Sequence, residues 1–480
     1  MDAALAALLT AFTCEPLLTG LGAGGYMLVV PADGGQPVLL DFFVEAPGRG
    51  AFGPSGPGGS ASAARPRAEL IPVPVSFGDA VQVFNVGAAS VGTYGMPLGV
   101  AEASSRFGRM ALSELVGPAA DLARRGAPLN PEQAYVVEIL AGLITSTPES
   151  AAIFAPGGEL LTAGDTVRQP GVADALEQLG EEGAEPFYTG EIARRVTDWL
   201  GERGGLVSAE DLAAYRLIDR EPVRVAYRGR QVLTNPPPSA GGILIAYALG
   251  LLERRPGPAS LEAIVEAMER SQSARTPEFL ESLGDPGFAQ RFLAQGGGRL
   301  GSTTHVAVLD RAGMACSVTS SNGACSGVVV PGTGLHLNNM LGEQDLNPLG
   351  FHRHPPGRRL PSMMAPTVVL RDGRPELVLG SAGSNRIRSA ILQTIVRVID
   401  GGMRAGDAVE APRIHYEDGI VYTEPGIDVD GIDRSRYGHA AFRARNLFFG
   451  GVQAVERDAE GGFWGGGDPR RGGAAVVVES

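Results

Sequence analysis

Lysine is absent from this 480-residue sequence, whose 40 basic residues are all arginine. This absence excludes chemistries that need a lysine amine, namely a Walker-type phosphate loop, a pyridoxal Schiff base and a serine–lysine dyad. An amine that acts as a catalytic base here must therefore be a chain terminus. The net charge is −13 and no basic stripe is interleaved with aromatics, so nucleic acid is not an expected partner.

Cysteine is also scarce, and Cys14, Cys316 and Cys325 show neither metal-ligand nor disulfide spacing. The histidines have no convincing ligand spacing, so we expect no metal. The glycines of TGLGAGGYM match a GxGxxG spacing, but they follow a helical pattern and precede a strand. A dinucleotide site needs the reverse order, so we expect no cofactor.

No apolar run approaches the roughly 18 residues that a membrane span needs, so we expect a soluble chain with no membrane partner. The start MDAALAALLTAF has an acid at Asp2 and no basic segment before its apolar residues, unlike a secretory signal. This favours a cytoplasmic location. The helix is entered abruptly, which indicates a start that is internal to a longer chain and an export signal that could be missing.

Hydrophobic periodicity divides the chain into a helix-rich first part and a strand-rich second part. Before residue 270 it predicts helices over 2–12, most of 96–207 and 243–252, strands over 26–30 and 38–43, a loop over 51–67 and a capping box at Ser208–Asp211. After residue 303 it predicts strands over 304–310, 316–321, 327–330, 335–337, 367–370, 376–379, 448–456 and 474–478, and a helix over 387–400. The pattern indicates two sheets covered by helices.

A Gly-rich run at 294–299 ends in GSTTHVAVLD, where Thr303 stands at the junction of loop and strand. A threonine hydroxyl is a weak nucleophile without an adjacent base. If the bond between Ser302 and Thr303 is cut, the new α-amine, with a reference pKa of about 7.7 to 8.0, becomes a base for its own hydroxyl. The alternative is that Thr303 simply opens a strand.

GSTTHVAVLDRAGMACSVTSSNG and GVVVPGTGLHLNNM resemble the start of the small subunit in the γ-glutamyltransferase family. Further similar segments are EPLLTGLGAGGYML, FYTGEIA, SAEDLAAY, TNPPPSAGG, LPSMMAPTVVL, GSAGSNR and GGDPRRGG, so the resemblance covers essentially the whole chain. It implies an α/β (α+β) fold, the four-layer αββα sandwich of N-terminal-nucleophile enzymes. It also implies a precursor that cleaves into residues 1–302 and 303–480, an obligate heterodimer that forms one αββα unit.

The resemblance also implies roles for individual residues. Thr303 corresponds to the residue that cleaves the precursor and then acts as the nucleophile, and Ser321 to a hydroxyl that supports it. Gly383 and Ser384 correspond to the pair whose N–H groups form the oxyanion hole. The implied activity is hydrolysis or transpeptidation of γ-glutamyl amides such as glutathione, through an acyl ester on Thr303 that passes to water or to an amino acceptor.

The substrate side departs from the family pattern. Phe43 stands where the family has an arginine that pairs with the α-carboxylate of the substrate, and a charge-assisted hydrogen bond contributes about 1.5 to 3 kcal/mol. Arg49 and Arg386 are candidates to replace that charge. This departure favours an alternative, a cephalosporin-acylase-like or glutaryl-type amide acylase. A non-cleaving homologue that binds a ligand or partner is a third possibility.

Four more residues are implied to bind substrate. Glu343 falls where the family has an aspartate that holds the substrate amine, with a solvated loop carboxylate as the alternative, and it follows Asn339. Ser362 is what remains of a serine pair, with Met363 in the second place. Asn322 lies one place from the asparagine of the family. His305 alternates away from Thr304 along the predicted strand, so we interpret it as structural rather than catalytic.

Overall fold

The computed structural model describes residues 1–50, 69–76, 81–274, 279, 283, 303–344, 346–347 and 350–478. The predicted loop over 51–67, the Gly-rich run at 294–299 and Ser302 lie outside the described residues. The chain forms two compact units. The first comprises Met1–Gly25, Asp41–Ile218 and Ser320–Leu360, and the second comprises Tyr26–Leu40, Asp219–Thr319 and Pro361–Ser480.

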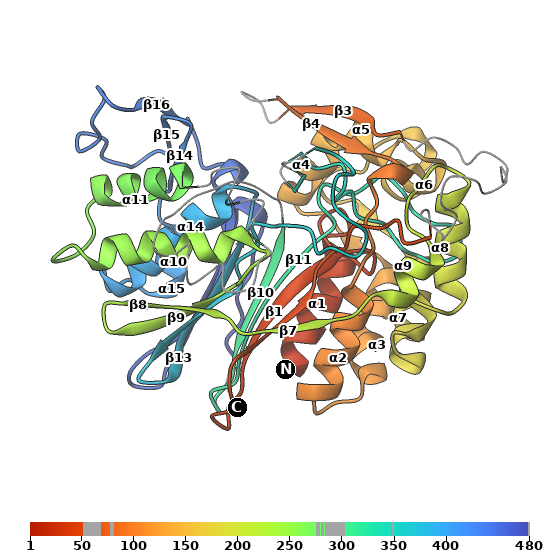
Figure 1. The fold of residues 1–480 in the computed structure, drawn as a ribbon, viewed down its shortest axis with the longest axis horizontal. Coiled ribbons are helices and arrows are strands. Elements are labelled where there is room, and N and C mark those ends of the chain that lie inside the picture. Colours follow the sequence, from red (N-terminus) through yellow and green to blue (C-terminus); the bar gives the residue numbers. More distant parts are fainter. Residues whose placement is uncertain are drawn as a thin grey trace. The chain divides into compact units, whose positions relative to one another are not determined.

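The first unit is mainly helical (Figure 1). Its helices are α1 (Asp2–Cys14), α2 (Met96–Phe107), α3 (Leu112–Arg125), α4 (Pro131–Ile139), α5 (Ala141–Ile144), α6 (Pro148–Phe154), α7 (Pro170–Glu182), α8 (Glu191–Gly201) and α9 (Ala209–Ala214). Its short strands are β3 (Ile71–Ser76), β4 (Val81–Val86), β5 (Ala127–Pro128) and β6 (Thr166–Val167). The predicted capping box is confirmed, because Ser208 accepts from the Asp211 N–H and Asp211 accepts in return from the Ser208 N–H.

The second unit is built on a six-stranded sheet in the order β18-β17-β13-β12-β9-β8. Its strands are β8 (Val223–Tyr227), β9 (Arg230–Thr234), β12 (Thr367–Arg371), β13 (Arg374–Ala382), β17 (Gly451–Arg457) and β18 (Phe463–Gly467). Three helices, α10 (Ala240–Glu253), α14 (Arg386–Ile399) and α15 (Ala405–Glu410), pack on this sheet (Figure 1). Their apolar side chains form a continuous core with those of β9, β12 and β13.

A five-stranded sheet in the order β10-β11-β1-β2-β7 carries the predicted strand pair after Thr303. Its strands are β10 (Thr304–Leu309), β11 (Ala315–Ser321), β1 (Gly24–Val30), β2 (Val38–Phe42) and β7 (Ile218–Arg220). Within the second unit, β10 packs on β13 and β17 of the six-stranded sheet. The second unit therefore has a layer of helices, then the six-stranded sheet, then the strands of the five-stranded sheet that belong to this unit.

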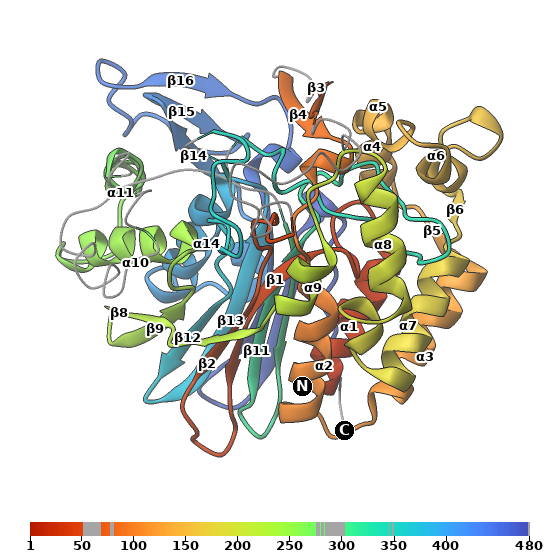
Figure 2. The ribbon, with the colours of Figure 1, turned by 45° about the vertical axis from the view of Figure 1, so that its right-hand side comes forward.

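A small sheet of β14 (Ile414–Glu417), β15 (Ile420–Thr423) and β16 (Gly438–Ala441) lies beside α11 (Leu261–Ser273) in the second unit (Figure 2). The prediction missed this sheet. β14 also contacts α14, so the small sheet is packed against the helix that follows GSAGSNR.

Four predicted strands are wrong or displaced. Residues 474–478 form no strand, and the late strand is instead β18, which pairs with β17 from Arg457↔Phe463 to Gln453↔Gly467. Segments 327–330 and 335–337 are joined only by an isolated bridge between Val329 and His336. The strand predicted from residue 448 begins at Gly451, because Leu447–Phe449 is a 3-10 turn and Gly450 has a φ of 80°.

Candidate active site

Thr303 immediately precedes β10 in the second unit and is only 1% exposed. Its Oγ1 has no hydrogen-bond partner among the described residues. A buried hydroxyl without a partner costs roughly 1 to 3 kcal/mol, so such a group calls for an explanation.

His305 is structural, as its place on the strand predicted. Its Nδ1 lies 2.8 Å from Thr319 Oγ1, and its ring packs against Gly380, where an added Cβ would lie 2.3 Å from Cε1. Burial lowers the pKa of His305 to about 3, so the ring is neutral at physiological pH. The His305 contact with Gly380 therefore sets the spacing between β10 and β13.

Thr303 and the Gly383–Ser384 turn lie at the same end of the packed strands. The turn after β10 meets the far end of β17, because Arg457 donates to the Arg311 carbonyl at 3.3 Å. That end of β17 pairs with the start of β13, where Glu456 opposes Leu377. β10 thus finishes where β13 starts, so Thr303, before β10, lies toward the end of β13 that leads into Gly383.

The turn itself has a conformation suited to anion binding. Gly383 and Ser384 have φ values of 115° and 62°, and α14 begins two residues later at Arg386. The Gly383 carbonyl accepts from the Arg386 N–H and the Ser384 carbonyl from the Ile387 N–H, both at 3.1 Å. The turn therefore sits at the positive end of the α14 dipole, which favours negative charge.

Asn385, between the turn and α14, is held by a pair that the sequence prediction missed. Its Nδ2 donates to Glu417 Oε1, and Glu417 Oε2 lies 3.3 Å from His415 Nε2. Burial raises the pKa of Glu417, but the hydrogen bond from His415 and nearby arginines outweigh it and lower the pKa to about 2. Burial lowers the pKa of His415 to about 4. An ionised Glu417 thus anchors the start of α14.

Ser362 is joined to the TNPPPSAGG segment. Its hydroxyl donates to Ser239 Oγ at 3.0 Å, and Ser239 Oγ in turn lies 2.7 Å from the Met364 carbonyl. Asn235 Nδ2 also donates to that carbonyl at 2.8 Å. The two family-like segments therefore form one hydrogen-bonded loop pair in the second unit, and Ser239 and Asn235 were not predicted.

In the first unit, Asn339 and Glu343 converge on the tight turn that follows β11. Asn339 Oδ1 and Glu343 Oε1 both accept from the Ala324 N–H at 2.9 Å. Gly323, with a φ of 68°, is required there, because an added Cβ would lie 2.1 Å from Asn339 Oδ1. Glu343 is only 5% exposed, so the alternative of a solvated loop carboxylate is wrong.

Two further predicted residues border this turn. Ser321 ends β11, is fully buried, and its Oγ accepts from the Gly323 N–H at 2.7 Å. Asn322 is also fully buried, and neither atom of its side-chain amide has a hydrogen-bond partner in the described parts of the chain. Asn322 therefore has unused hydrogen-bonding capacity beside Asn339 and Glu343.

Phe43 is fully buried in the first unit, where its carbonyl accepts from Tyr215 Oη at 2.7 Å. The guanidinium carbon Cζ of Arg359 lies over the Tyr215 ring, 4.3 Å from its centroid. Arg359 also forms ion pairs with Asp41 at 3.2 Å and with Glu45 at 2.9 Å. The Phe43 N–H also donates to Asp41 Oδ1 at 3.0 Å, so both backbone groups of Phe43 are bonded to residues that contact Arg359.

The two arginines suggested as replacements are also engaged within their own units. Arg49 pairs with Glu45 at 3.1 Å and with Asp211 at 3.6 Å. Arg386 Nε donates to the Phe448 carbonyl at 2.8 Å, and its guanidinium lies over the Phe448 ring.

The predicted residues thus form two sets. The second unit holds Thr303, Ser362 and the Gly383–Ser384 turn, and the first unit holds Ser321, Asn322, Asn339 and Glu343. Among the described residues, no group of three or more His, Cys, Asp or Glu side chains is placed to hold a metal ion. Within the same residues, no helix is both long and apolar enough to cross a membrane.

Comparison with known proteins places the chain in a family. Residues 1–478 match the gamma-glutamyltranspeptidase family. The acylase ACY 1 proenzyme of Pseudomonas sp. (strain SE83) is 32% identical, over 100% of this chain and 89% of the relative. The glutathione hydrolase proenzyme of Bacillus subtilis (strain 168) is 29% identical, over 100% of this chain and 87% of the relative.

The fold agrees with the same assignment. The crystal structure of cephalosporin acylase from Bacillus halodurans superposes with a TM-score of 0.81 at 25% identity, covering 100% of this chain and 91% of that one. The predicted α+β sandwich of the N-terminal-nucleophile class is confirmed. The chain belongs to the gamma-glutamyltranspeptidase family and is an N-terminal-nucleophile amidohydrolase.

Proposed function

We propose that this enzyme is a self-processing threonine amidohydrolase and acyltransferase that acts on γ-glutamyl amides through an ester on Thr303. The observation that carries the proposal is the buried hydroxyl of Thr303, which has no hydrogen-bond partner among the described residues and lies at the end of β10 nearest the Gly383–Ser384 turn. A nucleophile and an anion-binding turn on one end of a packed sheet pair are the two groups that acyl transfer requires.

The precursor step supplies the missing base. Thr303 Oγ1 attacks the Ser302 carbonyl, the peptide N–C bond breaks as the nitrogen takes a proton, and an ester joins Ser302 to Thr303. Water hydrolyses the ester, which releases the Ser302 carboxylate and leaves Thr303 with a free α-amine. Fragments 1–302 and 303–480 then stay together as a heterodimer, because strands of both fragments share the five-stranded sheet.

The mature reaction uses that amine as the general base. The amine takes the proton of Oγ1, and Oγ1 attacks the substrate carbonyl to form a tetrahedral oxyanion. The N–H groups of the Gly383–Ser384 turn stabilise the oxyanion, and one such donor contributes about 2.7 to 4 kcal/mol. The leaving amine departs with the proton, and water or an acceptor amine then cleaves the ester by the reverse path.

Glu343 supports a γ-glutamyl acyl group. The side chain of Glu343 is buried and accepts from the Ala324 N–H, and a carboxylate is the side chain that pairs with an ammonium group. The neighbouring amides of Asn322 and Asn339 offer further polar contacts. The α-ammonium of a γ-glutamyl substrate has the matching charge.

A glutaryl-type acyl group is the second candidate, and Phe43 and Met363 indicate a changed binding site for the carboxylate that glutaryl and γ-glutamyl groups share. Both are apolar, at most 1% exposed, and stand where the family has groups that bind the α-carboxylate. The 32% identity to a protein named as an acylase also supports this candidate. On this hypothesis the site does not require the ammonium group of the acyl chain.

Three anilides with one leaving group separate the candidates. γ-Glutamyl p-nitroanilide carries an ammonium and a carboxylate, the glutaryl anilide lacks the ammonium, and the butyryl anilide lacks both. We expect kcat/KM to be highest for γ-glutamyl, with Thr303→Ala inactive on all three. A preference for glutaryl supports the second candidate. No turnover and no covalent adduct with azaserine contradicts both, and indicates a homologue that only binds ligand.

A further inference from the structure

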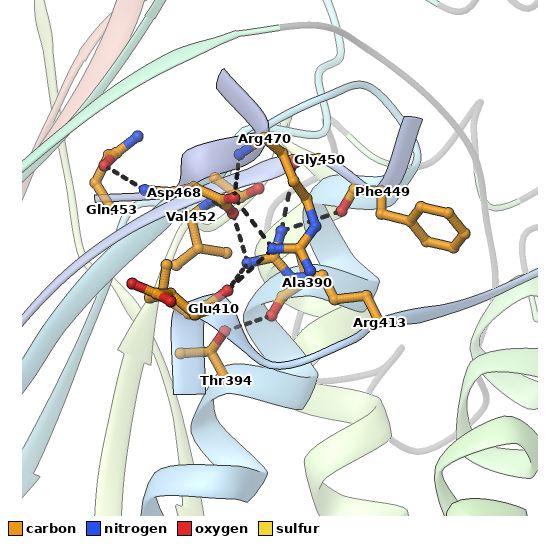
Figure 3. Close-up of polar contacts among 12 residues, drawn as sticks. Ala390, Thr394, Glu410, Arg413, Phe449, Gly450, Val452, Gln453, Asp468 and Arg470 are labelled. Carbon is orange, nitrogen blue, oxygen red and sulfur yellow. Dashed lines mark hydrogen bonds and ion pairs between the residues drawn. The ribbon is translucent and has the colours of Figure 1, made fainter. Parts of the chain in front are cut away.

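The proposed reaction gives no role to the GGDPRRGG segment. Two of its residues, Asp468 and Arg470, belong to a buried ion network (Figure 3). Asp468 Oδ2 pairs with Arg413 Nη2 at 2.6 Å and accepts from the Val452 N–H at 2.8 Å. Asp468 Oδ1 accepts from Arg470 N at 2.9 Å and pairs with Arg470 Nη1 at 3.1 Å. Asp468 and Arg413 are fully buried and Arg470 is 5% exposed.

Glu424 completes the network, which then holds two positive and two negative charges. Arg470 Nε donates to Glu424 Oε1 at 2.8 Å, and a second ion pair joins Arg470 Nη2 to Glu424 Oε2. Glu424 also accepts from the Arg413 N–H at 2.9 Å and from the Asn446 N–H at 3.2 Å. The network thus ties the start of β14, segment 446–452 and η5 (Pro469–Arg471) to one another.

Arg413 connects this network to the Gly383–Ser384 turn through Gly450. Its Nη1 donates to the carbonyls of Phe449 and Gly450, each at 3.3 Å (Figure 3). A Cβ added to Gly383 would lie 2.6 Å from Gly450 Cα, and one added to Gly450 would lie 2.8 Å from the Ala382 carbonyl oxygen. The turn therefore rests directly on Gly450, whose carbonyl Arg413 holds.

We propose that Arg413, Asp468, Arg470 and Glu424 are positioning residues that fix Gly450, and through it the Gly383–Ser384 turn, for stabilisation of the oxyanion. The inference rests on the proposed function, in which this turn is the oxyanion hole. Apolar residues of equal volume often stabilise a fold as well as a buried ion network does. They cannot, however, make the directed hydrogen bonds that hold one carbonyl in place.

Two variants test the proposal with a matched control. Arg413→Lys keeps the positive charge beside Asp468 but lacks the fork that also reaches the Gly450 carbonyl. Asp468→Asn keeps the shape and the acceptor for the Val452 N–H but removes the charge. The control is Glu376→Gln, which breaks the ion pairs of a buried carboxylate with the partly exposed Arg230 and Arg371 at the opposite end of β13 from the turn.

Two readouts are needed on cleaved enzyme well below its melting temperature. The first is steady-state kinetics on the best anilide, where we expect kcat to fall about 10- to 100-fold in both variants, the range that a misplaced donor produces, with KM within about 2-fold. The second is hydrogen exchange of residues 380–386 and 446–452, which we expect to accelerate in both variants. Glu376→Gln is expected to change neither readout.

The outcomes are distinguishable. If kcat and exchange of these segments match the wild type while only the melting temperature falls, or if Glu376→Gln lowers kcat equally, the network is merely structural. If Asp468→Asn does not fold, Arg413→Lys alone decides. If the wild type turns over no amide, the proposed function fails, and exchange still tests whether the network holds the turn.

Discussion

Gly380 offers a sharp test of how the second unit positions Thr303, the proposed nucleophile. In Gly380→Ala, the new Cβ would lie 2.3, 2.4 and 2.8 Å from Cε1, Nδ1 and Cγ of His305. Ordinary carbon contacts lie near 3.5 Å, so the ring must move by about 1 Å. His305 is 6% exposed and bonded to Thr319, so it cannot move without repacking β10 against β13.

The expected penalty is that of an overpacked core, about 1 to 3 kcal/mol in the free energy of unfolding. The matched control is Gly250→Ala in α10 of the same unit, where an added Cβ meets no atom within 4 Å. Alanine is the better helix former, so this control should stabilise by roughly 0.5 to 1 kcal/mol. The same substitution thus has opposite signs at the two sites.

Thermal melting of both variants measures this effect, at roughly 2 to 4 °C per kcal/mol in a domain of 150–250 residues. Because Thr303 lies only two residues before His305, the rate of precursor cleavage should also fall in Gly380→Ala, by up to about 100-fold for a 1 Å displacement. A melting temperature within 1 °C of the wild type, together with an unchanged cleavage rate, refutes the argument that this contact sets the strand spacing.

Three further predictions concern substrate binding and pH. Glu343→Gln should lower kcat/KM for the γ-glutamyl anilide about 10-fold and leave the glutaryl anilide unchanged; equal losses on both exclude a contact with the ammonium. Phe43→Arg should raise kcat/KM for glutaryl relative to butyryl anilide about 10- to 100-fold, and an unchanged ratio excludes Phe43 as the lost carboxylate site. Burial lowers the pKa of His305 to about 3, so this side chain binds a proton more readily in the unfolded state. The free energy of unfolding should therefore fall as the pH drops below about 6.5, by up to about 1.4 kcal/mol per pH unit. Urea midpoints at pH 6.5 and 5 measure this slope, which His305→Gln should reduce; an equal slope in that variant contradicts a buried neutral His305.

Much of the fold was predictable where local pattern and burial agree. The strand after Thr303 and the helix over 387–400 have strong periodicity and lie in buried layers, and both are confirmed. The tail Ala474–Val478 has strand-like residues but pairs with no strand among the described residues, and Val476 is 81% exposed. By contrast, the glycine-rich β18 has weak strand propensity and is a strand because β17 pairs with it.

The candidate site was predictable only in part, for a related reason. Thr303 and GSAGSNR are continuous segments whose chemistry is local, so the sequence carries a signal for them. The Arg413–Asp468–Glu424 contacts and the Asn385–Glu417 bond join residues that are far apart in sequence and recognisable only once folded. Burial of a polar side chain indicates that it has a specific partner, but burial is known only from the folded structure and not from sequence spacing.

Self-cleavage at Thr303 is the central claim, and intact mass spectrometry tests it most directly. The account predicts that purified wild type yields fragments 1–302 and 303–480, that Thr303→Ser also cleaves, and that Thr303→Ala remains one chain of 49.7 kDa. A folded wild type that stays at 49.7 kDa contradicts the account, because the enzyme then lacks the α-amine that a chain without lysine needs as its base.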